Sequence, residues 1–193
     1  MRHYKQRGVT LPVTFLLLLA ALTLGASAAH TAMLGEKAAR AERDRLIAFQ
    51  AAEDAMMDAE RDINAGLSVP VEVSPTGAGA DGPAPAPAWQ TVDLAGDGGT
   101  EYGAMTGAAM DVGEASLPFR RPRYLVERVT YTPPGKPPAH YYRVTVIGFG
   151  TRPGSEAVLQ ASFQPPLPVR RHSWREIMDW QALHDAADAG DGQ

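Results

Sequence analysis

The chain carries at Val9–Ala29 the uncharged apolar run VTLPVTFLLLLAALTLGASAA, and a charged segment with helical periodicity follows at Glu36–Asn64. At about 1.5 Å of rise per residue, a helix as long as this 21-residue run crosses roughly the hydrocarbon core of a bilayer. Because no turn signal separates the two segments, we expect one long helix, with a transmembrane part at 9–29 and an amphipathic continuation at 30–66. Such a helix can lie in a membrane and later pack among copies of itself.

The residues before the apolar run allow two interpretations. Residues 1–8 are short and basic, and positive flanks of a membrane helix stay on the cytoplasmic side. One interpretation is an ordinary cleaved signal peptide, since Leu11–Leu24 has the size of its apolar core and Ala26–Ala28 fits the small-residue rule for cleavage before Ala29. The other is a leader peptide of residues 1–8, cleaved after Gly8, which leaves the apolar helix on the mature protein.

The residues around Gly8 resemble a known processing signal. The stretch KQRGVTLPVTFLLLLAALTL is similar to the class III signal of the type IV pilin superfamily, with a short basic leader, the glycine and then the hydrophobic helix. Further on, RLIAFQAAEDAMMDAE (Arg45–Glu60) resembles the segment that follows the membrane helix in PilX-type minor pilins, where an AFQAAE-like core is characteristic. The resemblance implies cleavage between Gly8 and Val9 by a prepilin peptidase, and methylation of the Val9 amine.

The chain departs from the usual pilin pattern at Val13. In most pilins a glutamate lies five residues into the mature chain, and its charge is thought to pair with the amino terminus of the neighbouring subunit. Counted from Val9, that place holds Val13. Since an unpaired carboxylate in hydrocarbon is costly, the valine suits a subunit that resides in lipid. It fits a scarce subunit at the filament tip better than a major one.

An apolar stripe continues along the charged segment at helical spacing. Its large members are Leu46, Phe49, Met56 and Ile63, with the small Ala52 and Ala59 between them. We expect this stripe to pack against a sheet or inside a filament. Asn64–Gly66 then gives a natural helix stop.

The charged residues of the same segment are interpreted as a solvated helix face. Two pairs of opposite charge have the spacing for ion pairs within one helix, namely Glu36 with Arg40 and Glu42 with Arg45. These pairs are expected to support the helix without taking part in the core.

Residues 67–122 are expected to form a Pro/Gly-rich variable loop region. The span Val69–Trp89, VPVEVSPTGAGADGPAPAPAW, offers little to bury. Asp93, Asp97 and Glu101 lack the regular spacing of a Ca²⁺-binding loop, so we interpret them as a plain acidic turn. The five histidines are scattered and form no metal-ligand motif. We therefore expect no metal and no other cofactor.

Residues 123–165 predict an antiparallel β-sheet. Three runs are rich in β-branched and aromatic residues, namely Tyr124–Tyr131, His140–Gly150 and Ala157–Phe163. Short Pro- and Gly-containing turns join them, so a meander is the simplest topology. Each run offers one largely apolar face that can cover the helix stripe. The predicted fold is α+β, with a long N-terminal membrane-spanning and amphipathic helix packed on a small antiparallel sheet, which is the pilin arrangement.

The C-terminal residues 166–193 predict a capped helix and a disordered tail. Ser173–Glu176 matches a capping box, and the residues after Leu183 are polar. Four apolar residues of this region are candidates for contact with a partner: Trp174, Ile177, Met178 and Trp180. Docking on the sheet edge of the same chain is the alternative for them.

The composition excludes several classes of function. The chain has no cysteine, which excludes disulfides, thiol catalysis and Cys-based zinc sites. The net charge of −4 includes the basic leader, so the remainder is more acidic still and a nucleic-acid partner is not expected. The sequence shows neither a G-x-S-x-G motif nor a phosphate-binding glycine loop. We interpret the chain as an assembly protein and not as an enzyme.

The resemblance implies a minor pilin that primes or caps a type IV pilus and supports adhesion and twitching motility. Its implied partners are other minor and major pilins, a tip adhesin-like protein, the prepilin peptidase and the inner-membrane assembly platform. Before assembly it would lie in the bacterial inner membrane as a single-pass protein with a periplasmic C-terminal domain, and afterwards at the pilus tip on the cell surface. The alternatives are a minor pseudopilin of a type II secretion system and a secreted binding module with an ordinary signal peptide.

Overall fold

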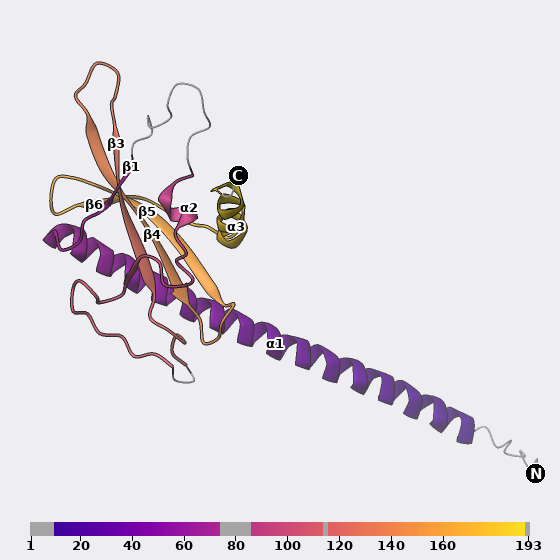
Figure 1. The fold of residues 1–193 in the computed structure, drawn as a ribbon. Helices are drawn as coiled ribbons and strands as arrows, with labels where there is room; N and C mark the ends of the chain where they lie inside the picture. The colour runs from indigo at the N-terminus through magenta and orange to yellow at the C-terminus, as the bar shows by residue number, and fades with distance from the viewer. Residues whose placement is uncertain (1–9, 74–85, 114–115, 192–193) are drawn as a thin grey trace, which may run out of the picture. The chain divides into compact units, whose positions relative to one another are not determined.

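A computed structural model describes residues 10–73, 86–113 and 116–191 (Figure 1). In chain order its elements are α1 (Thr10–Ala65), β1 (Val71–Val73), α2 (Ala88–Thr91), β2 (Thr100–Glu101), β3 (Arg123–Tyr131), β4 (Ala139–Phe149), β5 (Glu156–Gln164), β6 (Arg170–Glu176) and α3 (Trp180–Asp191). The chain forms two compact units, residues 1–43 and residues 44–193. The predicted leader and the Gly8–Val9 junction lie outside the described residues.

The first unit is helical through all its described residues, 10–43. The prediction of one helix that joins the apolar and the charged segments is confirmed, because α1 runs unbroken through Gly25 and Gly35. Among the described residues, α1 alone is long and apolar enough to span a bilayer, judged by length and composition.

The end of α1 lies in the second unit and is closed by a glycine. Gly66 has a φ of 60°, a left-handed conformation that glycine adopts without steric cost. Its N–H donates to the carbonyl of Ile63, and the N–H of Leu67 donates to the carbonyl of Asp62, both at 3.2 Å. These two bonds form a Schellman motif that satisfies carbonyls at the helix end. The predicted helix stop at Asn64–Gly66 is confirmed.

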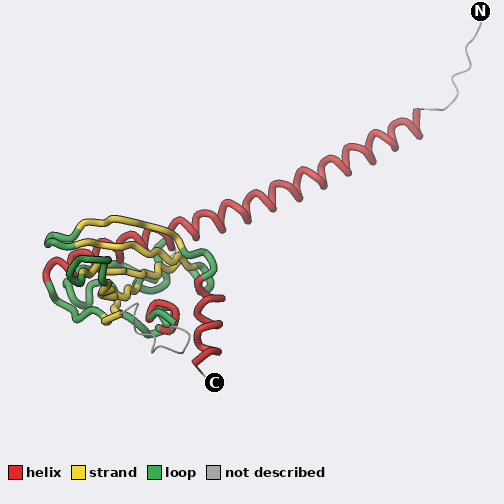
Figure 2. The backbone as a smooth tube through the Cα atoms, turned by 90° about the horizontal axis from the view of Figure 1, so that it is seen from above, coloured by secondary structure: helices red, strands yellow, loops and turns green. Residues whose placement is uncertain are grey.

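The sheet of the second unit has six strands, in the order β1-β3-β4-β5-β6, with β2 also paired to β3. The strands β3 to β6 pair antiparallel in sequence order, so the predicted meander of three strands is confirmed and extended by β6. β1 runs parallel to β3, and β2 runs antiparallel to it. Figure 2 shows the strands gathered into one layer with helical and loop segments beside it. The predicted α+β class is confirmed.

One face of the sheet carries the C-terminal part of α1. The buried core between them includes Met56 and Ile63 of the helix and the strand residues Tyr124, Val126, Val144, Val146, Leu159, Ala161 and Phe163. The approach is closest at Gly148 of β4, where a Cβ atom would lie 2.1 Å from the carbonyl oxygen of Ala48 and 2.3 Å from the amide nitrogen of Ala52. Glycine at this position therefore lets the helix backbone lie directly on the strand.

The second face of the sheet carries α2 and α3. Its core joins Leu125, Ile147, Phe149 and Val158 of the strands to Trp89, Leu94, Ile177 and Trp180. Alternation along β4 explains the two cores, since Val146 faces α1 and its neighbour Ile147 faces the other side. The span 67–122, predicted as a loop region, thus contributes two short strands and the short helix α2.

The prediction of a capped helix at Ser173–Glu176 is wrong. These residues belong to β6, where they pair in regular register with Leu159–Ser162 of β5. The capping-box pattern is local, whereas the ladder with β5 pairs one side of the segment along its whole length and prevails. The helix α3 begins only at Trp180, and it continues through residues predicted to be a disordered tail, as far as Asp191.

Candidate assembly surfaces

The first candidate surface is the apolar part of α1. All its large apolar side chains are exposed, namely Leu11, Val13, Phe15, Leu16, Leu17, Leu18, Leu19, Leu22, Leu24, Met33 and Leu34. The hydroxyls of Thr14, Thr23 and Thr31 donate to the carbonyls of Leu11, Ala20 and Ser27 at 2.9 to 3.0 Å. Polar groups that bond within their own helix are compatible with lipid or with other helices. This surface can therefore be buried without leaving a polar group unpaired on these threonines.

Of the two ion pairs expected within the helix, one forms, and in the other the arginine has a different partner. Glu36 and Arg40 form the predicted pair. Arg45 instead donates to both carboxylate oxygens of Glu176 on β6, each at 2.9 Å. Both bonds come from Nη2, and they are charge-assisted hydrogen bonds to a carboxylate that the sheet holds in place. Arg45 thus helps to fasten α1 to the sheet.

The part of α1 in the second unit is tied to the sheet at both ends. At its start, Asp44 accepts from the N–H and the hydroxyl of Thr151, both at 2.6 Å. Burial raises the pKa of this carboxyl, but the bonds from Thr151 and Ser155 outweigh it, so the pKa lies below its ordinary value. At the end of the helix, the Asn64 side-chain oxygen accepts from the N–H of Val169 at 2.7 Å.

Two carboxylates between these ties are fully buried, which corrects the interpretation of the helix charges as a solvated face. Asp58 accepts from the N–H of Gly103 at 2.8 Å and from the hydroxyl of Thr106. Each donor lies in the loop that follows β2, so Asp58 fixes that loop onto the helix. A buried carboxylate is tolerated when its oxygens accept several bonds.

Asp62 is the second buried carboxylate. It accepts from Ser68 through the N–H at 2.9 Å and the hydroxyl at 2.6 Å, and from the Tyr124 hydroxyl at 2.9 Å. Burial, together with the bond to Asp62, raises the pKa of Tyr124. The sequence did contain a signal that both residues are buried. Asp58 and Asp62 are four residues apart, one turn of the helix, and lie on either side of Ala59, which belongs to the packed side of the helix.

The predicted apolar stripe is only partly in the core. Met56 is fully buried and Ile63 is 8% exposed, whereas Leu46 is 56% exposed and lies outside the core. Leu46 is two residues from the fully buried Ala48, which is about 200° around the helix, so Leu46 faces away from the sheet. Phe49 is partly buried at the edge of the core.

The ring of Phe49 packs against Trp174 of β6. Their centroids are 5.9 Å apart with an interplanar angle of 68°, and the indole N–H donates to Glu53 at 3.0 Å. Glu53 also faces Arg171 of β6 at 3.5 Å. Trp174 remains 44% exposed, so this contact between α1 and β6 leaves an apolar surface open to solvent.

The four predicted partner-contact residues therefore separate into two groups. Ile177 and Trp180 are buried within the same chain, while Trp174 and Met178 are exposed, the latter by 84%. The Trp180 indole donates to the carbonyl of Trp89 at 3.3 Å, and its ring stacks on that of His184 at 5.1 Å. The helix α3 thus docks on α2 of its own chain.

The acidic turn is surrounded by arginines. Asp93 accepts from the N–H of Gly96 at 2.7 Å. Asp97 lies 3.5 Å from Arg123, and Glu101 lies 3.4 Å from Arg121. Across the described residues no group of three His, Cys, Asp or Glu side chains could hold a metal ion. Asp97 and Glu101 thus have protein cations as their neighbours.

Residues 51–165 match the family model of the C-terminal part of the type IV pilus assembly protein PilX. The chain belongs to the PilX family. No curated protein and no solved structure matches it. The recognition of a PilX-type pilin from the sequence is confirmed.

The PilX match covers much of the core between α1 and the sheet. It begins within α1, includes both buried aspartates and ends after β5. The strand β6 and the helix α3 follow the matched span. The PilX chain is thus a type IV pilus component whose apolar helix suits membrane anchoring and pilus association.

Proposed function

We propose that this PilX-family chain is a minor pilin that primes or caps type IV pilus assembly. The observation that carries the proposal is the exposed and uncharged surface of α1 from Thr10 to Gly35. In a membrane this surface contacts lipid, and in a filament it is buried against other helices. The transfer exchanges one apolar environment for another, so helix packing and van der Waals contact decide between them.

The residue Val13 supports a role in small copy number. A major subunit is thought to use a glutamate at this place to meet the amino terminus of its neighbour, and Val13 has no charge to offer. A subunit that starts or caps the filament needs no such pairing. A carboxylate there would be buried without a partner, at considerable cost.

The proposed life cycle begins with a single-pass protein in the inner membrane, its C-terminal unit in the periplasm. A prepilin peptidase cleaves between Gly8 and Val9 and methylates the new amine. The assembly platform then moves the mature chain into the filament, together with other minor and major pilins and a tip adhesin-like protein. At the pilus tip the complex supports adhesion and twitching motility.

To test this role in assembly, the chain is expressed in cells that carry the assembly machinery but lack their own minor pilins. We expect restored piliation only together with the other minor pilins, and a copy number far below that of the major pilin by mass spectrometry. Val13→Glu is expected to be neutral or harmful to piliation. Abundant filaments made of this chain alone would overturn the proposal.

Amino-terminal analysis of the same material tests the maturation step. The mature chain should begin with a methylated Val9, and replacement of Gly8 by a bulky residue should leave the longer precursor in the membrane. A mature chain that begins at Ala29 would instead establish an ordinary signal peptide and remove the apolar helix from the filament.

A further inference from the structure

The strand β6 forms one edge of the sheet. The strand order ends at β6, and among the described residues β5 is the one strand that pairs with it. An edge strand presents a row of backbone N–H and C=O groups that another strand can pair with. A register shift occurs at Ser162/Phe163 of β5, opposite the start of β6, whereas Ser173–Glu176 is in regular register. This regular stretch is the part of the edge that can extend the sheet.

The edge is basic although the chain as a whole is acidic, at −4. The strand carries Arg170, Arg171, His172 and Arg175, and its one acid, Glu176, is held by Arg45. Two copies of β6 paired edge to edge would bring their arginines close together, and like charges across a ladder are destabilising. The same charges favour a strand that carries carboxylates.

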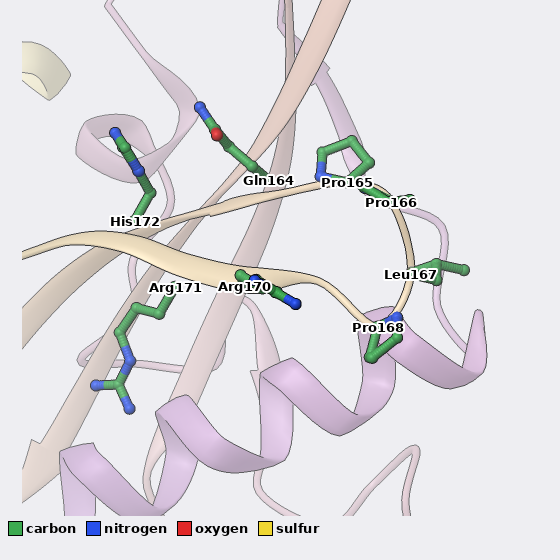
Figure 3. A pocket seen from close by; sticks show the side chains of 8 residues that line it. All are labelled: Gln164, Pro165, Pro166, Leu167, Pro168, Arg170, Arg171 and His172. Carbon is green, nitrogen blue, oxygen red and sulfur yellow. The ribbon is translucent and has the colours of Figure 1, made fainter.

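Two hollows along the strand, one at its start and one further on, leave room for side chains of an added segment. One, of about 520 Å³, is lined by the proline turn and the start of β6, including Leu167 and Arg170. Figure 3 shows Arg171 directed toward α1 and His172 directed away from it. The other, of about 430 Å³, is lined by Tyr141, Arg143, Ser162, Ser173 and Arg175 on the sheet face opposite α1.

The side chains of β6 alternate in chemistry between the two faces. Trp174 lies on the α1 side, where its half-exposed ring offers an apolar contact. Ser173 and Arg175 lie on the opposite side. The Arg175 guanidinium donates to Gln160 at 2.7 Å through Nη2 and at 3.2 Å through Nε, which holds it beside the hollow. An added strand would therefore place apolar residues beside Trp174 and carboxylates beside Arg175.

We propose that the β6 edge binds an extended acidic segment of another protein by strand addition, with apolar and acidic residues in alternation. The backbone of Ser173–Glu176 supplies the ladder, Trp174 the apolar contact, and Arg170 and Arg175 the charge selection. The surface lies on the sheet and not on the apolar part of α1, so it does not depend on the proposed role in pilus assembly. The proposed role in pilus assembly matters only for one further step, namely that the bound segment belongs to another pilus component.

A peptide of about eight residues, the length of an ordinary strand, in which valine and aspartate alternate, tests the proposal. The full-length protein in detergent micelles is titrated against the fluorescently labelled peptide, and anisotropy reports binding. Arg170→Glu should weaken binding about fivefold, as expected for the loss of an exposed charge contact. Lys136→Glu makes the same charge change in the turn between β3 and β4, which lines neither hollow, so this variant is the matched control and should leave binding unchanged.

Two further measurements separate strand addition from simple charge attraction. A peptide in which two valines are replaced by proline keeps every carboxylate but cannot complete the ladder, so its binding should be lost. Hydrogen exchange on the unaltered protein should show peptide-dependent protection of β6 amides. Equal binding of the proline peptide, equal effects of the two charge reversals, or no protection in β6 would each overturn the proposal.

Discussion

Substitution of Gly148 by alanine is the most direct test of how α1 lies on the sheet. The added methyl group would be 2.1 Å from the Ala48 oxygen, 2.3 Å from the Ala52 nitrogen and 2.8 Å from the Ala52 Cβ. Ordinary contacts of carbon are about 3.5 Å, so the helix would have to move by roughly 1 Å. The two nearest atoms belong to the helix backbone and cannot rotate away.

The displacement would strain the contacts on both sides of Gly148. It would pull Asp44 from Thr151 and loosen the packing of Met56, so we place the cost at the upper end of the overpacking range, about 3 kcal/mol. For a unit of this size that lowers the unfolding midpoint by roughly 6–12 °C. The assay is thermal and urea unfolding of the full-length protein, followed by tryptophan fluorescence.

Two variants serve as controls for Gly148→Ala. Gly35→Ala adds the same methyl group to α1 where no atom lies within 4 Å, and should leave the unfolding of the sheet unit unchanged. Ala52→Gly, combined with Gly148→Ala, removes only the most distant of the three clashing atoms and should restore little stability. An unchanged midpoint for Gly148→Ala, or full rescue by Ala52→Gly, would refute the close approach of helix and strand.

Three other predictions concern the contacts of the second unit. Trp180→Ala should lower the free energy of unfolding by about 3–5 kcal/mol and expose α3 to proteolysis, because Trp180 is only 3% exposed. Met178 is exposed, so Met178→Ala should change the stability in urea by less than about 0.5 kcal/mol. Similar effects of the two substitutions would contradict the docking of α3. Asp44→Asn should make stability fall less steeply in acid. Because the pKa of Asp44 is lowered in the folded state, its carboxylate stabilises the fold above the ordinary pKa of 3.8, and this contribution is lost as the pH falls through the folded-state pKa. Acid unfolding curves of the same slope for both proteins would argue against this role. Phe49→Ala should cost about 2 kcal/mol, and its effect should couple to that of Trp174→Ala by about 1 kcal/mol in a double-mutant cycle; strict additivity would exclude the ring contact.

The sequence predicted those parts of the fold that local patterns determine. Apolar and β-branched alternation was sufficient for β3, β4 and β5, and the glycine after Ala65 was sufficient for the end of α1. The family resemblance rested on the Gly8 junction with its apolar helix and on Arg45–Glu60 at the start of the helix–sheet core. These signals are short in range, so each can be interpreted without knowing what the segment packs against.

The parts that the sequence did not predict depend on distant partners. Ser173–Glu176 has a helix-start pattern, but its backbone pairs with β5. Asp58 and Asp62 resemble solvated helix charges until Thr106 and Tyr124 are brought beside them. Leu46 continues the spacing of the apolar stripe, yet it lies on the side of α1 that faces away from the sheet. In each case a contact between segments far apart in sequence overrides a local preference.

The contacts of residues 44–65 also have a mechanical consequence. Asp44 holds one end of this helical segment to Thr151, Asn64 holds the other end to Val169, and the buried carboxylates Asp58 and Asp62 lie between them. A force along the helix axis would load these bonds together and in shear, so that each carries a share of the tension. A force perpendicular to the axis would break them one after another. The segment 44–65 is therefore attached so that it resists a force along the helix axis, while a force that peels it from the sheet at one end would need to be far smaller.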